Sequence, residues 1–320
     1  MDRLDKIAGP LHGVYAAIPT PFGNDGQPDL PALDPVVDFL IDAGVDGLCL
    51  GGATGEYPAC NIRERELISQ RVAARSKGRV PLIFGVGAGN AAQVSYLATV
   101  AQKCGGCAVL LPPPFYFRYN ASDIVEFIRD LGRRFPLPAL IYYIPQFTNP
   151  FNLADAIHLI ESIPNIVGIK DSSGLDENVS LIAEAKAKIP MIHFSGDDSQ
   201  LINAYQHGAD GAISGVATAC PELLVTVERI RRRGTSSYPD SVQNLLKEFI
   251  AQICALPVPW GIKVAMEVRG FQMGPLSWKG SKKLETQIAA FQEWFRAWLP
   301  TCLETCSSHN VNAPVNNDEL

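Results

Sequence analysis

Eight short apolar runs, spread over the first 215 residues, constrain the fold more than any other feature of the chain. Between them lie longer segments in which apolar residues recur every three or four positions, as in a helix with one buried face. Strands that are separated by helices pair in parallel and are buried on both faces, so they read as continuous apolar runs. The predicted strands are 13–19, 45–51, 80–86, 107–112, 138–145, 165–170, 190–196 and 211–215, and the clearest helical segments are 31–44, 62–78, 91–105 and 153–163.

Eight strand–helix units in about 220 residues predict an α/β fold, a (β/α)₈ TIM barrel with a C-terminal helical extension. A doubly wound sheet is the alternative, but it needs a G-x-G-x-x-G turn after the first strand, and the sequence has none there. We expect the barrel core in 1–218, and the last barrel helix and the helical extension in 219–302, including a long helix at 282–299. The polar stretch 303–320 predicts a disordered tail.

Charge and composition exclude several classes of protein. The chain has 27 Lys+Arg against 33 Asp+Glu, a net charge of −6, which argues against a nucleic-acid binder. The sequence contains no run of about 18 apolar residues, so we predict no membrane span. The first ten residues, MDRLDKIAGP, lack the apolar core of a signal peptide, so we expect a cytoplasmic protein whose eight cysteines are thiols.

One close pair of cysteines raises the question of a metal. Cys104 and Cys107 have a spacing that could suit a metal or a redox dithiol, and Cys302 and Cys306 form a looser pair. Zinc needs four ligands at suitable spacing, whereas the five histidines fall singly. We therefore predict no metal site.

Lys170 is the most informative residue at the end of a predicted strand. In a barrel the chemistry lies where the C-terminal ends of the strands meet the loops. Lys170 closes the apolar run 165–169, so we expect it at the barrel mouth, where burial favours a neutral amine. A neutral amine can attack a ketone and form a Schiff base. Alternatively, Lys170 only forms an ion pair with the neighbouring Asp171.

Tyr142 lies on the preceding strand, next to Lys170 around the barrel. Formation of a Schiff base moves protons on and off oxygen, and a phenol near the amine can carry them. Because side chains alternate along a strand, only one of Tyr142 and Tyr143 can face the interior. Tyr142 could also serve core packing alone.

Two loops offer further candidates for substrate contacts. The loop 51–56, G-G-A-T-G-E, presents backbone N–H groups and the Thr54 hydroxyl, which could hold a carboxylate. Its glycines could equally serve only the geometry of the turn. Asp197 and Asp198 follow the seventh strand, and we expect at least one of them to cap the next helix.

Together these segments resemble the dihydrodipicolinate synthase / N-acetylneuraminate lyase family, pyruvate-handling class I aldolases on a (β/α)₈ barrel. The resemblance runs from about residue 12 to residue 299. It is carried by T-P-F at 20–22, G-G-A-T-G-E at 51–56, P-F-Y at 114–116, I-Y-Y-I-P at 141–145, V-G-I-K-D at 167–171, S-G-D-D at 195–198 and G-A-I-S-G at 211–215.

The resemblance implies a role for each matching residue. Lys170 would form the Schiff base and Tyr142 would carry protons, while Thr54 and the backbone of Ala53 would bind the carboxylate of a 2-oxo acid such as pyruvate. Tyr116 would reach into the site of a neighbouring subunit in a homotetramer built as a dimer of dimers. The resemblance implies no metal and no organic cofactor. Further candidate contacts for the substrate are Ser172, Ser195, Gly196, Asp197 and Ser214.

Departures from the family pattern bear on the substrate. Dihydrodipicolinate synthases carry an arginine where this chain has Phe147, and loss of that guanidinium removes a bidentate anion contact, which disfavours that activity. They also usually carry two adjacent threonines where this chain has Ala53 and Thr54. Sialic acid lyases usually carry an acid at the position of Ser199, which counts against a long sugar.

An aldolase that cleaves a 2-keto-3-deoxy sugar acid, or a related hydroxy-oxo acid, to pyruvate and an aldehyde fits best. A dehydratase of a keto-deoxy sugar acid would use the same lysine. A non-catalytic binder of 2-oxo acids is a third possibility, although both Lys170 and Tyr142 are present.

Overall fold

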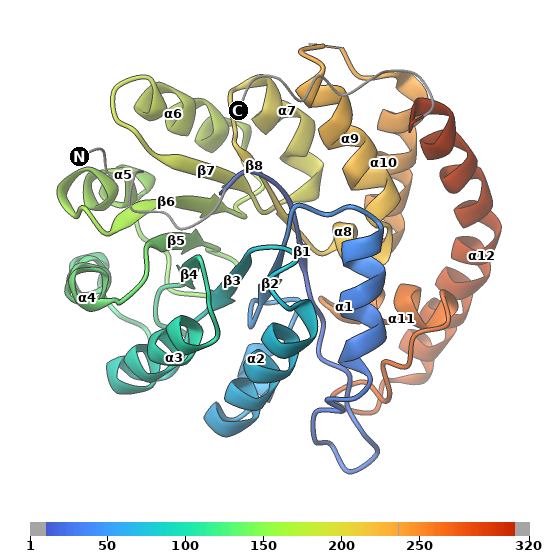
Figure 1. Ribbon diagram of the computed structural model, residues 1–320, viewed down its shortest axis with the longest axis horizontal. Coiled ribbons are helices and arrows are strands. Elements are labelled where there is room, and N and C mark those ends of the chain that lie inside the picture. The colour runs from blue at the N-terminus through green and yellow to red at the C-terminus, as the bar shows by residue number, and fades with distance from the viewer. Residues whose placement is uncertain (1–10, 236, 311–320) are drawn as a thin grey trace.

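A closed barrel of eight parallel strands forms the centre of the molecule (Figure 1). The structure, a computed structural model, describes residues 11–235 and 237–310. Each strand pairs with the next, and β8 returns to β1 with Gly13 opposite Gly211, which closes the ring. The predicted fold class and all eight predicted strands are confirmed. The strands are β1 Gly13–Ala17, β2 Gly47–Leu50, β3 Leu82–Gly85, β4 Ala108–Leu111, β5 Ala139–Tyr143, β6 Ile166–Asp171, β7 Ile192–Ser195 and β8 Gly211–Ser214.

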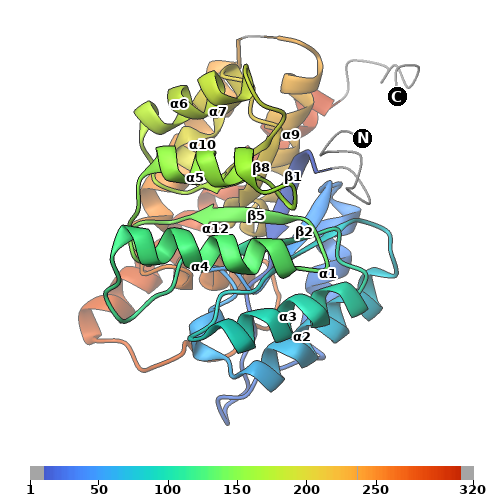
Figure 2. The ribbon, with the colours of Figure 1, turned by 90° about the vertical axis from the view of Figure 1, so that its left-hand side faces the viewer.

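Helices surround the barrel and cover its outer face. Figure 2 shows α4 and α5 running on either side of β5, as the right-handed strand–helix–strand connection requires. The outer helices are α1 Leu33–Asp42, α2 Ile62–Ser76, α3 Ala91–Lys103, α4 Ala121–Arg134, α5 Leu153–Ser162, α6 Asp176–Lys186, α7 Leu201–Gln206, α8 Val216–Ala219 and α9 Pro221–Arg232. Beyond them come α10 Asp240–Ile253, α11 Trp260–Val268 and α12 Lys282–Asn310, and two short 3₁₀ helices are η2 Tyr57–Ala59 and η3 Asp198–Gln200.

Alternation along the strands divides the core into two layers. One set of side chains fills the barrel interior, where Tyr15 and Phe194 meet edge to face with their ring centroids 5.3 Å apart. The other set points outward and packs against the helices. Tyr142 belongs to the inner layer, whereas Tyr143 points outward and donates a hydrogen bond to the carbonyl of Phe151 at 2.9 Å. The expected separation of these two tyrosines is confirmed.

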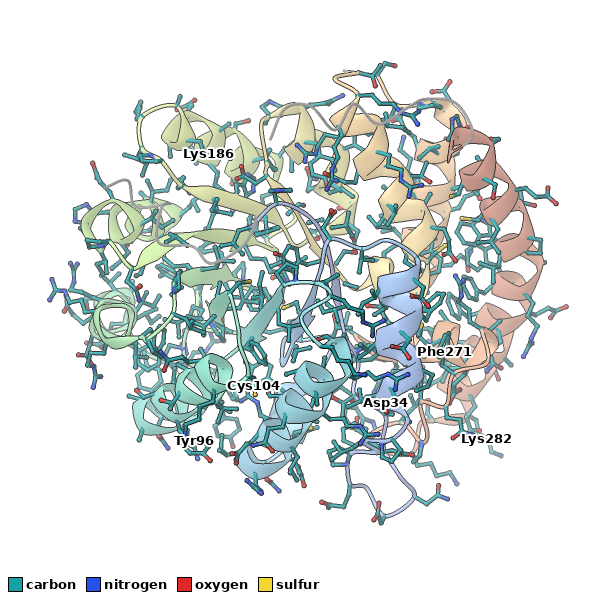
Figure 3. The ribbon with its side chains drawn as sticks, viewed as in Figure 1. Asp34, Tyr96, Cys104, Lys186, Phe271 and Lys282 are labelled. Atoms are coloured by element: carbon teal, nitrogen blue, oxygen red, sulfur yellow. The ribbon has the colours of Figure 1, made fainter. Side chains whose placement is uncertain are left out.

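Polar and aromatic contacts connect the outer helices to one another. Asp34 on α1 accepts two hydrogen bonds from the Arg71 guanidinium on α2, at 2.7 and 2.6 Å (Figure 3). Phe271, which follows α11, packs on Phe39 of α1 with the ring centroids 4.9 Å apart. The C-terminal segment is thereby attached to the first barrel helix.

The C-terminal helix is longer than predicted. We expected a helix at 282–299 and a disordered tail from 303, but α12 continues to Asn310 across Pro300, so the expectation for 303–310 is wrong. The reason is that the apolar face of the helix continues through Cys302 and Cys306. Their side chains are small, so a search for bulky apolar residues overlooks them. Figure 1 shows α12 along the outer side of α9, α10 and α11. Its buried face is Phe291, Phe295, Trp298, Cys302 and Cys306. The remainder of the predicted tail, 311–320, lies outside the described residues.

All eight cysteines are free thiols. Cys107 points into the barrel and donates to the carbonyl of Leu82, whereas Cys104 lies at the end of α3 in the outer layer. Within 11–235 and 237–310, no group of three or more histidine, cysteine, aspartate or glutamate side chains is arranged to hold a metal ion. No helix in the same ranges is both long and apolar enough to cross a membrane.

His193 on β7 is buried between the barrel and the helices. Its side chain is 1% exposed, and neither ring nitrogen has a hydrogen-bond partner among the described residues. Burial, together with the positive charge of Lys186 on α6 (Figure 3), lowers the pKa of His193 to about 3. Lys186 itself donates to Asp210 at 2.5 Å, and Asp210 also accepts from the backbone N–H of His193 at 2.7 Å. The imidazole is therefore neutral in the folded protein.

We predict that His193 destabilises the protein in mild acid. Below pH 6.5 the unfolded chain protonates this imidazole while the folded chain does not, so stability falls as the pH falls from about 6.5 towards 3. Between pH 7 and pH 5, wild type should lose about 2 kcal/mol more unfolding free energy than His193→Leu, measured by urea denaturation. His158→Leu, at an exposed position on α5, is the control and should keep the wild-type pH dependence. Equal losses in wild type and His193→Leu would contradict the prediction.

Candidate active site

Lys170 and Tyr142 lie side by side at the C-terminal end of the barrel. They occupy paired positions on β6 and β5, and the Lys170 Nζ lies 4.2 Å from the centroid of the Tyr142 ring. The two side chains are only 5% and 4% exposed. Among the described residues no carboxylate lies within ion-pair distance of Lys170. Asp171, the alternative partner, instead accepts a hydrogen bond from the Ser173 N–H at 3.0 Å, and burial raises the pKa of this carboxyl.

Gly196 brings the backbone after β7 close to Lys170. A Cβ at this position would lie 2.5 Å from the Lys170 Cε and closer still to the Ser172 Oγ, so any larger residue here would displace these two side chains. The Ser172 hydroxyl is buried and has no hydrogen-bond partner in the part of the chain that the structure describes. A buried polar group normally has a partner, which makes this hydroxyl a candidate contact for a ligand.

The loop after β2 presents Thr54 to the same cavity. Within the loop, the Glu56 N–H donates a hydrogen bond to the Ala53 carbonyl at 3.0 Å. From outside the loop, the Thr20 hydroxyl donates to the Gly55 carbonyl at 2.7 Å. Ala53 and Thr54 both line the cavity, and their binding of a carboxylate stays a prediction. The arrangement offers a hydroxyl and backbone groups within the same cavity as Lys170.

A buried ion pair connects this loop to α11. Glu56 adopts a left-handed backbone conformation, with φ of 51°, at the end of the loop. Its carboxylate lies 3.0 Å from the Lys263 Nζ, and the two side chains are 6% and 1% exposed. The Lys263 ammonium also lies 4.5 Å from the centroid of the Phe22 ring. This pair was not predicted, because the two residues are separated by 207 positions in the sequence.

The two aspartates after β7 have different roles. Asp197 caps η3, accepting from the Ser199 N–H at 2.9 Å and from its hydroxyl at 2.5 Å, which confirms the expected cap. Asp198 accepts from the Ser214 hydroxyl at 2.5 Å and lines the cavity. Burial, reinforced by the neighbouring Asp197, raises the pKa of Asp198 to about 6, against the opposing effect of the Ser214 hydrogen bond. Sequence reasoning did not separate these two carboxylates.

The cavity around these residues has a volume of about 260 Å³. Most of the predicted site residues line it: Ala53, Thr54, Tyr142, Lys170, Ser172, Gly196 and Asp197. Ser195 and Ser214 are not part of the lining, since Ser195 donates to the Asp197 carbonyl and Ser214 supports Asp198. The lining also includes Phe147 of the β5 loop, which the sequence analysis singled out. It further includes a wall that we did not predict, contributed by α10, α11 and the segment between these helices: Ile250, Ile253, Pro257, Val258 and Ile262.

Tyr116 lies outside the cavity of its own chain. Its side chain is 88% exposed and its φ is +75°, a conformation that is rare for a bulky residue. Its ring packs on Phe117 with the ring centroids 4.9 Å apart. The loop that carries it is held by Asn149, whose side-chain amide donates to the carbonyls of Pro114 and Phe117.

Comparison with known proteins places these features in a family. Residues 10–289 match the model of the dihydrodipicolinate synthetase family. An N-acetylneuraminate lyase of Rhizobium meliloti is 29% identical over 284 residues, covering 88% of this chain and 94% of that protein. A 4-hydroxy-tetrahydrodipicolinate synthase of Pseudomonas aeruginosa is 26% identical over 273 residues, covering 84% and 93%. A prophage protein of the dihydrodipicolinic acid synthase family from E. coli K12, solved in complex with pyruvate, superposes with a TM-score of 0.83 at 26% identity, covering 90% and 99%.

We predict that removing Lys263 alone destabilises the protein more than replacing Glu56 and Lys263 together. Lys263→Met leaves a buried carboxylate without its cation and should lower the unfolding free energy by about 3 to 5 kcal/mol in urea denaturation. The double variant Glu56→Gln, Lys263→Met should be more stable than Lys263→Met alone. Arg134→Met, in an exposed pair with Asp130, is the control and should change stability by less than about 1 kcal/mol. A small loss of unfolding free energy in Lys263→Met would contradict the prediction, because the Glu56 carboxylate would then be stable without its cation.

Proposed function

Because the chain belongs to the dihydrodipicolinate synthetase family, we propose that it is a Schiff-base-forming aldolase that cleaves a 2-keto-3-deoxy sugar acid, or a related hydroxy-oxo acid, to pyruvate and an aldehyde. Members of this family are pyruvate-dependent class I lyases and synthases. The observation that carries the proposal is a buried lysine, without a carboxylate partner among the described residues, next to a buried tyrosine at the floor of a cavity.

The first half of the proposed reaction forms the imine. The Lys170 amine attacks the C2 carbonyl of the substrate to give a carbinolamine, and loss of water leaves the protonated imine. Tyr142 moves the protons that these steps require. The substrate carboxylate binds at the Thr54 hydroxyl and the Ala53 backbone, which line the same cavity.

In the second half the C3–C4 bond breaks. Tyr142 takes the proton of the C4 hydroxyl, the bonding electrons move into the imine, and an aldehyde leaves. The resulting enamine is protonated at C3, and water hydrolyses the imine to release pyruvate and restore the Lys170 amine. Support for hydroxyl recognition comes from Ser172, whose hydroxyl has no partner within the described ranges, and from Asp198.

The alternatives use the same imine or the same cavity. A dehydratase would eliminate water from the imine and leave the carbon chain intact, so a keto-acid product without pyruvate would favour it. Dihydrodipicolinate synthase activity is disfavoured, because Phe147 lines the cavity where an arginine is expected. A non-catalytic 2-oxo-acid binder is disfavoured by the presence of Lys170 and Tyr142 together.

We also propose that the protein is a homotetramer built as a dimer of dimers, with Tyr116 completing the site of a neighbouring subunit. The exposed ring and the strained backbone of Tyr116 support this role, since such strain is usually found at functional sites. Light scattering that gives the mass of a monomer would contradict the proposal.

We predict that pyruvate and borohydride together will label Lys170. Reduction of the imine should add one reduced pyruvyl group, seen by intact-mass measurement and located by peptide mapping. Lys170→Ala should abolish the adduct, and Tyr142→Phe should slow its formation by about 10²- to 10⁴-fold. Lys282→Ala, at the exposed start of α12 (Figure 3), is the control and should be labelled as wild type is. An adduct that survives Lys170→Ala would overturn the assignment.

A further inference from the structure

The cavity that contains Lys170 has one polar side and one apolar side. Its polar side is the floor, where the ends of β5 to β7 and the loop after β2 place Tyr142, Lys170, Thr54 and Asp198. The apolar side is formed by α10, α11 and the segment that joins them, which contribute Ile250, Ile253, Val258 and Ile262 to the lining. The exposed ring of Phe147 completes this wall from the β5 loop.

The apolar wall offers few hydrogen bonds to a ligand. Its connecting segment contains Pro257 and Pro259, which lack a backbone N–H. Both proline carbonyls already accept hydrogen bonds, from Trp260 at 2.7 Å and from Ile262 at 2.9 Å. The segment therefore presents mostly side-chain carbon to the cavity.

Two polar side chains at the cavity rim already form hydrogen bonds within the protein. Gln146 donates to the Ser172 carbonyl at 2.7 Å, and Asp197 accepts twice from Ser199. Close to Lys170, the Ser172 hydroxyl has no partner in the described part of the chain, and Asp198, which accepts from the Ser214 hydroxyl, also lines the cavity. Among the described lining residues, the buried polar atom without a partner is therefore the Ser172 hydroxyl, at the floor of the cavity.

We infer that the substrate is a 4-hydroxy-2-oxo acid whose chain beyond C4 ends in an apolar group, alkyl or aryl, and not in a row of hydroxyls. This inference rests on the proposed function and narrows it, because it selects the hydroxy-oxo acids with an apolar end over the more highly hydroxylated sugar acids. A hydroxyl buried against Ile250 and Ile253 would lose its hydrogen bonds to water without replacement. A methyl group at the same place gains from leaving water.

The synthetic direction provides the test, with pyruvate and aldehydes that differ in the groups beyond the carbonyl carbon. 2-Methylbutanal has the shape of glyceraldehyde, with a methyl group in place of each hydroxyl. Wild type should use 2-methylbutanal with a kcat/KM about 10-fold or more above that of glyceraldehyde, tested as both enantiomers. In the series propanal, butanal and pentanal, kcat/KM should rise about 3- to 4-fold for each added methylene.

Variants separate the effect of the wall from the intrinsic reactivity of the aldehydes. Ile250→Asn and Ile253→Asn should each lower the ratio of kcat/KM for 2-methylbutanal to that for glyceraldehyde by about 10-fold. Ile157→Asn, a half-buried isoleucine on α5 outside the cavity, is the matched control and should leave the ratio unchanged. If the cavity variants leave the ratio unchanged, the inference is wrong. If they fail to fold, a flat or falling aldehyde series in wild type overturns it by itself.

The pyruvate adduct distinguishes failure of this inference from failure of the proposed function. Trapping by borohydride needs only pyruvate and Lys170, and not the apolar wall. An adduct without preference for the apolar aldehydes would refute the inference alone. Absence of the adduct would refute the proposed function and the inference with it.

Discussion

The alternation of side chains along β5 and β6 is the constraint on which the rest of the site depends. Lys170 and Tyr142 occupy paired positions, so both point into the barrel, while Asp171 and Tyr143 both point outward. A shift of one residue in the register of β6 would exchange the lysine for the aspartate. An amine that faces the cavity, with no carboxylate at ion-pair distance among the described residues, is therefore a consequence of how the barrel closes, and the local sequence K-D alone does not provide it.

One helix connects the polar floor of the cavity to its apolar wall. Lys263 on α11 holds Glu56, and thereby the loop that presents Thr54, while the preceding Ile262 lines the wall. A buried ion pair contributes little net stability, because desolvation offsets most of the attraction between the charges. Its contribution here is positional, since it requires α11 and the loop after β2 to keep one relative placement. Any movement of α11 would therefore also move the loop that presents Thr54.

Much of the fold and part of the site could be predicted from the sequence, for identifiable physical reasons. Buried parallel strands read as continuous apolar runs, and the residue that ends such a run lies at the barrel mouth, as Lys170 does. The same reasoning could not reveal Ile250 or Ile262, because they lie on helices and reach the cavity only through tertiary packing. The helical continuation through Cys302 and Cys306 was missed because polar composition hid an apolar face with the helical period.

The division between Asp197 and Asp198 shows how the apolar wall and the polar floor act together. Both aspartates follow β7, but the backbone turn makes Asp197 the cap of η3, and α10 packs against η3 beside Asp198. The helix that contributes Ile250 and Ile253 to the wall therefore lies beside Asp198, and burial raises the pKa of this carboxyl to about 6. A desolvated carboxylate binds a hydroxyl donor more strongly than a solvated one does. Helix α10 thus lies next to a polar contact of the floor and also contributes the apolar wall, and the substrate preference that we infer depends on both.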